Sequence, residues 1–376
     1  MKSMDQVRYG IIGYGKIGSQ HVKKILEGKV PSLKLTAIAD TDPQRLAAAR
    51  EALGDSVRYF SSAGALISSG AAEAVHICTP HYLHPSLAIL ALNAGLHTLV
   101  EKPAGVYTRQ VKEMNRVAKA HPELRFAMDF NQRTDPVFIQ ARNMVKAGEL
   151  GDIVHTHWLI TNWYRSQSYY DQGGWRATWK GEGGGVLLNQ NPHNLDMWQW
   201  IVGMPSRIRA QAYYGRHRNI EVEDDVIAMA EFPNGAIGTY ITTVIDAPGT
   251  NRLEIDGTLG RMVVENGKIH VDKLEMPEPE FNATWTKGLG KPKMEGLDIK
   301  PEGEYTSHPG IMENFCQSIL NGTPLYADGL EGINGLEISN AIHLSDWTGG
   351  GWVDLPVDEE LFCKLLSEKC GGKLPE

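Results

Sequence analysis

The stretch VRYGIIGYGKIG, residues 7–18, constrains the fold more than any other part of the chain. It begins as a short apolar strand and ends on Gly13, Gly15 and Gly18, which have the spacing G-x-G-x-x-G. In a dinucleotide-binding turn the first glycine lets the chain leave the strand, the second lets the backbone approach a pyrophosphate, and the third lets a helix pack on the sheet. We therefore expect a helix over residues 17–27 whose first N–H groups point at phosphates.

A second apolar run, LKLTAIAD, ends on Asp40, 22 residues after Gly18, where an acid that binds ribose is expected. A carboxylate accepts hydrogen bonds from both ribose hydroxyls of NAD and repels the additional 2′-phosphate of NADP. We therefore predict NAD as the cofactor rather than NADP. In the alternative interpretation, Asp40 only helps to cap a helix that begins at Asp42-Pro43.

The bulk composition restricts the class of protein and of partner. A chain of 376 residues exceeds the size at which single cores usually stop growing, which predicts two domains. The formal net charge is −8 and no block of Lys and Arg occurs, so neither nucleic acid nor a membrane surface is expected as a partner. We expect a small-molecule partner instead.

The segment MKSMDQVRYG has no apolar h-region, and no apolar stretch reaches about 18 residues, so we expect a cytoplasmic protein. The four cysteines, Cys78, Cys316, Cys363 and Cys370, are scattered without a C-x-x-C pair. This pattern argues against a zinc site or a disulfide framework, and we expect reduced thiols and no metal.

Residues 7–128 alternate apolar runs with helical patterns. The runs are VRYGIIG, LKLTAIAD, AEAVHICTP, HTLVEKP and RFAMDF. This alternation predicts β-α-β units and a parallel sheet covered on both faces, and hence an α/β fold with an N-terminal Rossmann domain over residues 1–128. Ligands bind at the carboxyl ends of such strands. The polar residues at these ends are Asp40, Thr79, Glu101, Lys102, Asp129 and Asn131.

Residues 129–376 are expected to form an α+β domain for substrate binding and oligomerisation. A helix is predicted over residues 136–147, and long alternating runs with Pro-Asn-Gly and Glu-Asn-Gly turns indicate a large, open, mainly antiparallel sheet. A loop rich in Pro, Gly and Lys is expected over residues 276–304, before helices over 309–320 and 329–345. An open sheet that faced solvent would favour aggregation, so we expect it to be buried between subunits of a homodimer or homotetramer.

The strand end HTLVEKP places Glu101, Lys102 and Pro103 together. A lysine held there beside bound nicotinamide would be partly desolvated and close to a cationic ring, and both effects lower the pKa of a lysine toward the working pH. Such a lysine could exchange a proton with an alcohol. Without the dinucleotide fold, the alternative is a surface ion pair between Glu101 and Lys102.

The segment GEGGGVLLNQNPHNLDMWQWIVG, residues 181–203, carries Asn189, His193 and Asp196 after a run of glycines. If it is one helix, Asn189 and His193 lie one turn apart on one face. Pro192 either kinks this helix or occupies the first position of a helix capped by Asn191. His193 has a structural or a catalytic role here, and the residues alone leave both open.

Four motifs follow one another along the chain. They are G-x-G-x-x-G with Asp40, VHICTPHYLH at 75–84, GLHTLVEKP at 95–103 and GGGVLLNQNPHNLD at 183–196. Together they resemble the glucose-fructose oxidoreductase/inositol dehydrogenase family (Gfo/Idh/MocA). The resemblance implies that Lys102 and His193 are the catalytic acid/base pair. Members commonly carry Asp four residues before this His, whereas this chain has Asn189, which cannot relay a proton and is expected to bind a substrate hydroxyl.

The resemblance also implies which residues contact the cofactor and the substrate. The predicted cofactor-binding residues are Gly13, Tyr14, Gly15, Lys16, Ile17, Gly18, Asp40, Thr79, Pro80, His84, Glu101, Lys102, Asn131, Trp175 and Arg176. The predicted substrate-binding residues are Lys102, Asn131, Arg133, Tyr164, Trp175, Arg176, Asn189 and His193. Most aromatic residues between 158 and 179 are expected in the core, but a loop so rich in Trp and Tyr suits stacking on a sugar ring.

The implied function is that of an NAD-dependent oxidoreductase that moves hydride between nicotinamide and a ring carbon of a sugar, glycoside or cyclitol. The Trp-rich insertion and the run NQNPH are similar to members that oxidise C3 of glucopyranosides, so C3 is the candidate carbon. Two alternatives remain open: an NAD-retaining glycosidase that acts by transient oxidation and elimination, and a non-catalytic ligand sensor. The presence of both Lys102 and His193 argues against the sensor.

Overall fold

The computed structural model describes residues 6–375, which form two compact units. The first unit holds the chain up to Thr134 together with Thr306–Leu336. The second unit holds Asp135–Tyr305 together with Glu337–Leu374. The chain therefore contributes to the first unit twice, and the later passage comes from a part of the sequence that follows the predicted boundary at residue 128.

The first unit is built on a six-stranded parallel sheet with the strand order β3-β2-β1-β4-β5-β6. The strands are β1 (Val7–Ile12), β2 (Leu33–Ala39), β3 (Arg58–Phe60), β4 (Ala74–Ile77), β5 (His97–Val100) and β6 (Phe126–Met128). The predicted parallel sheet is confirmed, and each of the five predicted runs contains a strand. The order reverses between β1 and β4, and in open α/β sheets ligands bind at such a reversal.

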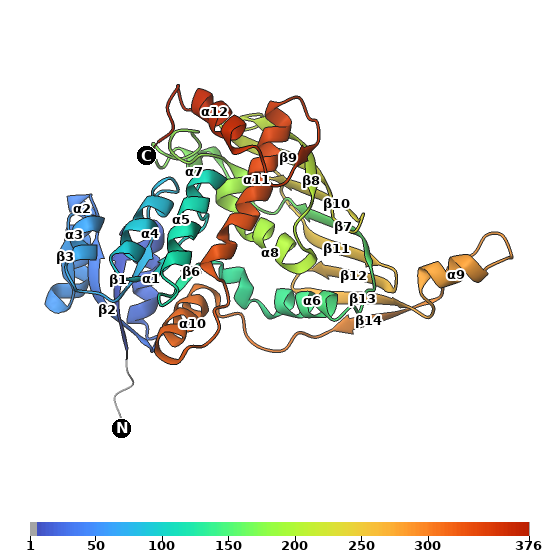
Figure 1. The fold of residues 1–376 in the computed structure, drawn as a ribbon, viewed down its shortest axis with the longest axis horizontal. Coiled ribbons are helices and arrows are strands. Elements are labelled where there is room, and N and C mark those ends of the chain that lie inside the picture. The colour runs from blue at the N-terminus through green and yellow to red at the C-terminus, as the bar shows by residue number, and fades with distance from the viewer. Residues whose placement is uncertain (1–5, 376) are drawn as a thin grey trace. The chain divides into compact units, whose positions relative to one another are not determined.

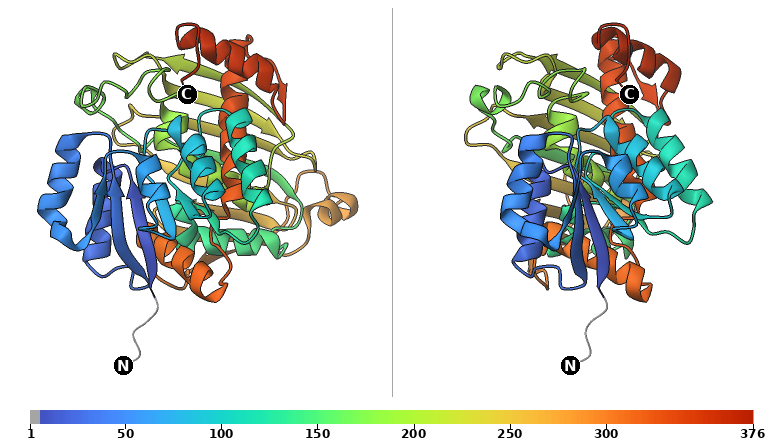
Figure 2. Two further views of the ribbon diagram at one scale, coloured as in Figure 1. Left: turned by 60° about the vertical axis from the view of Figure 1, so that its left-hand side comes forward. Right: turned by 90° about the vertical axis from the view of Figure 1, so that its left-hand side faces the viewer.

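Helices lie on both sides of this sheet, and they are drawn in blue, cyan and orange (Figures 1 and 2). They are α1 (Lys16–Leu26), α2 (Pro43–Leu53), α3 (Ala63–Ser68), α4 (Leu83–Asn93), α5 (Thr108–Ala120) and α10 (Ser307–Asn321), with short 3₁₀ turns at Gly54–Ser56, Asn131–Thr134 and Gly329–Glu331. The predicted helix over 17–27 is α1. Ile311 and Phe315 of α10 are buried in one core with Val7 and Ile11 of β1, so burial of apolar surface fixes this late helix to the first strand.

The second unit contains a nine-stranded sheet with the order β14-β13-β12-β11-β7-β10-β9-β8-β15. The strands are β7 (Ile153–Ile160), β8 (Arg207–Tyr214), β9 (Glu223–Glu231), β10 (Ile237–Thr243), β11 (Asn251–Gly257), β12 (Gly260–Glu265), β13 (Lys268–Leu274), β14 (Met294–Ile299) and β15 (Val353–Asp354). Among the pairs between described strands, β10 with β7 is parallel and the others are antiparallel. The prediction of a large, mainly antiparallel sheet is confirmed.

The second unit also contains helices and one π-helical segment. They are α6 (Pro136–Lys146), α7 (Gln167–Tyr170), the π-helix Val186–Gln190, α8 (Pro192–Val202), α9 (Glu278–Thr284), most of α11 (Gly332–Trp347) and α12 (Glu359–Lys369). The loop predicted over 276–304 is wrong in part, because it contains α9 and the strand β14. β14 pairs with β13, but most of its residues are exposed, so it shows no alternation of buried and exposed positions.

One face of the large sheet packs against α8. Trp198 of α8 donates its indole N–H to Thr156 Oγ1 of β7 at 3.1 Å and meets the ring of Phe232 edge-on. On other strand positions Val154, Ile227 and Ile237 are each more than a third exposed. Burial of this surface between subunits stays a prediction. Among residues 6–375, no helix has the length and apolar character needed to cross a membrane.

The turn between β1 and α1 depends on two glycines for its packing. Gly13 has φ +98°, and a Cβ atom there would lie 2.6 Å from the carbonyl oxygen of Cys78. A Cβ atom on Gly18 would lie 2.0 Å from the carbonyl oxygen of Gly13. Both contacts are with backbone atoms that cannot move aside cheaply, so α1 can approach the sheet only because these positions lack side chains.

This packing predicts that Gly18→Ala lowers the free energy of unfolding by about 2 kcal/mol or more, the cost of overpacking against fixed backbone. Urea unfolding of the full chain measures this change. Gly64→Ala is the matched control, because Gly64 lies in helix α3 with no atom within 4 Å of its added Cβ, and an alanine there should be neutral or slightly stabilising. Equal unfolding midpoints for the two variants would contradict the packing argument.

Candidate functional site

At the carboxyl edge of the parallel sheet, the space beside the Cα of Gly15 is open. A Cβ atom on Gly15 would meet only the guanidinium of Arg45, at 3.7 Å, so protein packing does not explain this glycine. Helix α1 begins at the next residue, with neither a capping side chain nor an acidic residue in its first turn. The N–H groups of that turn suit phosphate oxygens. These features fit the cofactor that the glycine spacing predicts.

Asp40 is buried at the end of β2 and connects this strand to the glycine turn. Its Oδ2 accepts the backbone N–H of Tyr14 at 2.7 Å, and its Oδ1 accepts that of Asp42 at 2.8 Å. The capping role considered for Asp40 belongs to Asp42, whose side chain accepts the N–H of Gln44 at the start of α2. Asp40 therefore fixes the turn and keeps a carboxylate where a ribose is expected. The cation Arg45 lies 3.8 Å from its Oδ2.

The loop after β4 is held by His84. The His84 ring places Nε2 2.7 Å from the carbonyl oxygen of Thr79 and Nδ1 2.7 Å from that of Pro103. Burial lowers the pKa of His84, while these two acceptors favour its protonated form. The ring thus braces two strand-end loops. The hydroxyl of Thr79 is buried and makes no hydrogen bond within residues 6–375, which leaves it suited to a ligand.

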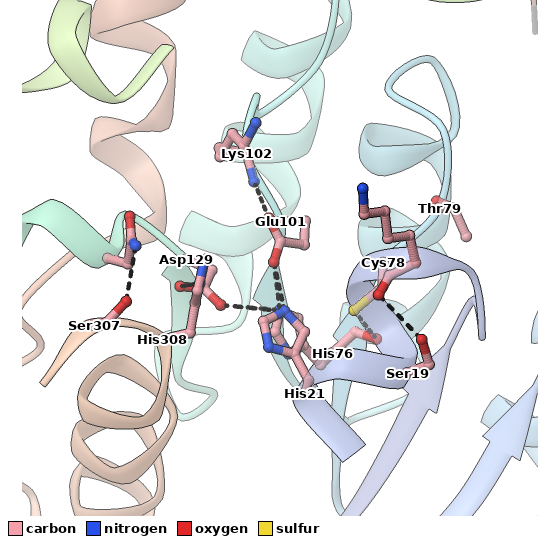
Figure 3. A network of polar contacts seen from close by, with 12 residues as sticks. Ser19, His21, His76, Cys78, Thr79, Glu101, Lys102, Asp129, Ser307 and His308 are labelled. Atoms are coloured by element: carbon pink, nitrogen blue, oxygen red, sulfur yellow. Dashed lines mark hydrogen bonds and ion pairs between the residues drawn. The ribbon is translucent and has the colours of Figure 1, made fainter. Parts of the chain in front are cut away.

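The segment Glu101-Lys102 is not a surface ion pair. Glu101 is 3% exposed, and its carboxylate points into the unit (Figure 3). Its Oε1 lies 2.6 Å from Nε2 of His21, and its Oε2 accepts the backbone N–H of Lys102 at 3.2 Å. The contact of Glu101 with the cofactor stays a prediction. His21, His76 and His308 surround this carboxylate, and none of them was predicted as a site residue from the sequence.

Two further predicted residues follow β6 in the first unit. Asn131 donates its side-chain N–H to Ser307 Oγ at 3.0 Å. Arg133 is 2% exposed, forms an ion pair with Glu331 and donates to the carbonyl oxygen of Tyr326 at 3.3 Å. These contacts give Arg133 a structural role between two passages of the chain, and its contact with substrate stays a prediction.

In the second unit, the predicted residues Asn189 and Arg176 lie close to a carboxylate, Glu182, that was not predicted from the sequence. Asn189 donates its side-chain N–H to Oε1 of Glu182, and Arg176 Nη1 lies 4.0 Å from the same oxygen. The guanidinium of Arg176 also lies over the ring of Trp175 and donates to the hydroxyl of Tyr169 at 2.8 Å. Burial raises the pKa of Glu182 to about 7. The glycine-flanked acid in GEGGG was the available signal.

The segment that carries Asn189 and His193 is not one helix. Residues Val186–Gln190 form a π-helix, and α8 begins at Pro192 after Asn191, which confirms the interpretation in which the proline occupies the first helical position. The side chain of Asn191 makes no capping hydrogen bond. His193 is the second residue of α8 and is 8% exposed. A shared helix face for Asn189 and His193, expected only for a continuous helix, is therefore not formed.

Glu223 of β9 fixes the start of the π-helix. Its Oε1 accepts the backbone N–H groups of Gly185 at 2.8 Å and of Leu187 at 3.0 Å. Its Oε2 lies 3.1 Å from Nε2 of His343.

Tyr164, in the aromatic segment of residues 158–179, is about half exposed, and the guanidinium of Arg218 lies over its ring. Its contact with substrate stays a prediction.

Comparison with known proteins identifies both parts of the chain. Residues 7–129 match the oxidoreductase family with an NAD-binding Rossmann fold, and residues 138–263 match the GFO/IDH/MocA C-terminal domain. The rhizopine catabolism protein MocA of Rhizobium meliloti is 26% identical over an alignment of 345 positions, and the match covers 90% of this chain and 94% of that protein. The levoglucosan dehydrogenase of Pseudarthrobacter phenanthrenivorans is 25% identical over 94% of this chain and 99% of its own length.

A solved structure is similar over nearly the whole chain. It is the WlbA dehydrogenase from Bordetella pertussis in complex with NADH and UDP-GlcNAcA, which is 28% identical and superposes with a TM-score of 0.78. The match covers 94% of this chain and 99% of that chain. Because the two family models together match most of the sequence, this chain belongs to the GFO/IDH/MocA family of NAD-binding oxidoreductases.

Proposed function

We propose that the protein is an NAD-dependent dehydrogenase that transfers hydride between nicotinamide and a ring carbon of a sugar, glycoside or cyclitol. The observation that carries this proposal is the carboxyl edge of the first unit, where Gly15, the uncapped start of α1 and buried Asp40 offer groups suited to a dinucleotide on the same edge as Lys102. Relatives named for levoglucosan and crystallised with UDP-GlcNAcA support a carbohydrate substrate. C3 is the ring carbon that we propose.

NAD supplies the hydride acceptor when it is bound. Lys102 then removes the proton of the substrate hydroxyl as its carbon is oxidised, or returns it in the reverse direction, and His193 assists as the second member of the pair. The carboxylate of Glu101 orients the backbone of Lys102 through a hydrogen bond. Holding the reacting carbons within about 3–3.5 Å supplies much of the rate, so residues that orient the substrate matter as much as the proton carriers.

The substrate-side residue Asn189 works with Glu182. An ionised Glu182 accepts one N–H of the Asn189 amide, and this bond fixes the plane of the amide toward the substrate hydroxyl that it binds. Members of the family commonly have Asp at this position, and here the carboxylate stands at residue 182 instead. The chain thus retains an acid next to the substrate while residue 189 itself carries no charge.

The test of the proposed function is a dehydrogenase screen of the full chain with NAD and NADP against glucosides, levoglucosan, inositols, sugar phosphates and nucleotide sugars. Formation of NADH with a keto sugar supports the proposal. Cleavage of a glycoside with no net NADH would contradict it and favour the NAD-retaining glycosidase. Ligand binding without any turnover would contradict it and favour the sensor.

The cofactor site predicts a change of preference in Asp40→Ser. Loss of the carboxylate removes its hydrogen bonds to ribose and its repulsion of a 2′-phosphate, so NAD affinity should fall about tenfold while the preference for NAD over NADP narrows. Fluorescence titration of both cofactors measures this. Asp42→Ser is the control, because Asp42 caps α2 and should leave the preference unchanged. Tighter binding of NADP than NAD by the wild-type protein would show that Asp40 does not select the cofactor.

The proton carriers predict losses in turnover. Lys102→Ala and His193→Ala should each lower kcat about 10²- to 10⁴-fold, the usual contribution of a positioned acid or base, with NAD affinity nearly unchanged. Lys119→Ala, an exposed lysine on α5, is the control and should keep wild-type kcat. If Lys102→Ala and His193→Ala both had a kcat close to that of the wild type, neither residue would be catalytic.

The Glu182–Asn189 contact predicts a pH-dependent defect in Asn189→Asp. Ionising both of two carboxylates in contact is costly, so their pKa values are higher in the folded state than in the unfolded state. The folded state therefore binds more protons than the unfolded state. The free energy of unfolding should therefore fall as the pH rises through about 7, with KM rising in parallel. The double variant Glu182→Gln/Asn189→Asp removes the second carboxylate and should restore both quantities. Equal stability of Asn189→Asp at pH 6 and 8 would contradict the contact.

A further inference from the structure

Five titratable side chains form a buried cluster beneath Lys102 (Figure 3). We call it the histidine–carboxylate cluster. Its members come from five elements of the first unit, namely His21 of α1, His76 of β4, Glu101 after β5, Asp129 after β6 and His308 of α10. All are buried except His308, whose side chain is one-quarter exposed. Buried charges are costly unless they are paired, so an arrangement of this kind requires an explanation.

The distances within the cluster are those of hydrogen bonds and do not fit a shared metal ion. Nε2 of His21 lies 2.6 Å from Oε1 of Glu101, and Nδ1 of His308 lies 2.8 Å from Oδ1 of Asp129. Two ligands of a tetrahedral zinc with bonds of about 2.0–2.1 Å lie about 3.3 Å apart, so both pairs are too close to be co-ligands. Each distance is that of a charge-assisted hydrogen bond. The cluster therefore contains two imidazole–carboxylate pairs.

Charge balance within the cluster depends on His308. Burial alone would lower its pKa, but the charge and hydrogen bond of Asp129, together with the charge of Glu101, raise the pKa of His308 to about 9. Burial would raise the pKa of Glu101, but the hydrogen bond and charge of His21 hold it well below its usual range. Burial and the neighbouring His21 lower the pKa of His76, so this side chain is neutral and contributes no charge to the cluster.

The cluster is joined directly to the lysine. Oε2 of Glu101 accepts the backbone N–H of Lys102, so the carboxylate that pairs with His21 also sets the position of the lysine. Without positive charges nearby, two carboxylates beneath an ammonium group would stabilise its proton and hinder its release. The imidazolium of His308 counters this field, and its charge acts on Lys102 with the opposite sign.

We propose that His308 is a positioning residue for Lys102: held on Asp129 as an imidazolium, it offsets the buried carboxylates and so sets the pH at which the lysine releases its proton. This inference rests on the proposed function, in which Lys102 carries the proton. His308 follows Asp129 by 179 residues and reaches the cluster only through α10, so the second passage of the chain through the first unit completes the site.

The titratable and charged groups around His308 come from every element packed against it. Those that act on it directly are Asp129, Glu101, Lys102 and His21, with His76, Cys78 and Tyr9 behind them. Burial raises the pKa of both Cys78 and Tyr9, so these two groups are neutral at physiological pH. His76 is neutral as well, because burial lowers its pKa, so the charges that the proposal invokes are those of the two carboxylates, His308 and Lys102.

The kinetic test is the pH profile of kcat between pH 6 and 10 for the full-length enzyme. In His308→Gln, the limb that requires deprotonated Lys102 should move upward by about one pH unit, the effect of losing one nearby positive charge. His308→Lys keeps the charge and should keep the wild-type profile. His121→Gln removes an imidazole outside the cluster and should also leave the limb in place.

A double variant separates charge from structure. His308→Gln/Asp129→Asn removes one charge of each sign, so its limb should return toward the wild-type position. An unchanged limb in His308→Gln, in a protein that binds NAD and melts like the wild type, would overturn the proposal. An equal shift in His308→Gln and His308→Lys would also overturn it, because the effect would then not depend on charge.

Titration of Lys102 in the absence of substrate keeps failure of this inference apart from failure of the proposed function. Reductive ¹³C-methylation followed by NMR gives the pKa of each lysine, and loss of one signal in Lys102→Arg assigns the residue. The pKa of Lys102 should rise by about one unit in His308→Gln. If this shift occurs in a protein without dehydrogenase activity, the proposed function is wrong, but the effect of the His308 charge on the pKa of Lys102 is supported. Dehydrogenase activity with no shift overturns the charge offset alone.

Discussion

The carboxylate of Glu101 is the interaction on which the first unit depends. Its two oxygens hold His21 of the helix that follows the glycine turn and the backbone of Lys102 at the end of β5. Removing a carboxylate from water costs several kcal/mol, and the cost is offset only by hydrogen bonds and opposite charge in good geometry. The residues that meet this requirement come from separate strands and helices. The same contacts of Glu101 therefore contribute to the packing of the unit and to the position of Lys102.

The second unit also contains buried carboxylates that accept several hydrogen bonds, and they lie around residues 181–203. Glu223 accepts two backbone N–H groups where the π-helix begins, and Glu182 accepts the backbone N–H of Ala177 at 2.7 Å as well as the amide of Asn189. π-Helical segments are rare and are frequently found at functional sites. Here Glu223 satisfies two backbone N–H groups at the start of the π-helix, where a helix itself supplies no partner. The bond from Asn189 to Glu182 limits the orientation of the Asn189 side chain.

Local patterns predicted much of the first unit and of the cofactor edge. The roles of Gly13 and Gly18 follow from turn geometry, and the strand ends place Asp40 and Lys102 at the carboxyl edge because parallel strands share one direction. Short or exposed elements were missed. Strand β3 has only three residues, and β14 is mostly exposed, so neither carries a readable pattern of burial.

Tertiary packing accounts for the partners and positions that local sequence did not predict. His308 meets Asp129 across 179 residues, and no local signal marks a histidine that will be paired by tertiary packing. A shared face for Asn189 and His193 required one continuous helix, and this periodicity fails where five residues adopt π-helical geometry and Pro192 starts a new helix. Glu182 is only seven residues from Asn189, yet its burial depends on the fold around it. Local sequence therefore predicts which residues can do chemistry, but not which partners set their charge.

That distinction bears on the proposed role of Asn189 in binding substrate. An acid at this place acts through its charge and its hydrogen bonds, and both can be supplied from a neighbouring position if the fold brings the side chains together. Glu182 lies on the chain before the π-helix and reaches the amide of Asn189, while burial raises its pKa to about 7, so its charge responds to pH near neutrality. An aspartate at 189 would compete with it for the same protons. The uncharged asparagine avoids this competition and donates a hydrogen bond to Glu182.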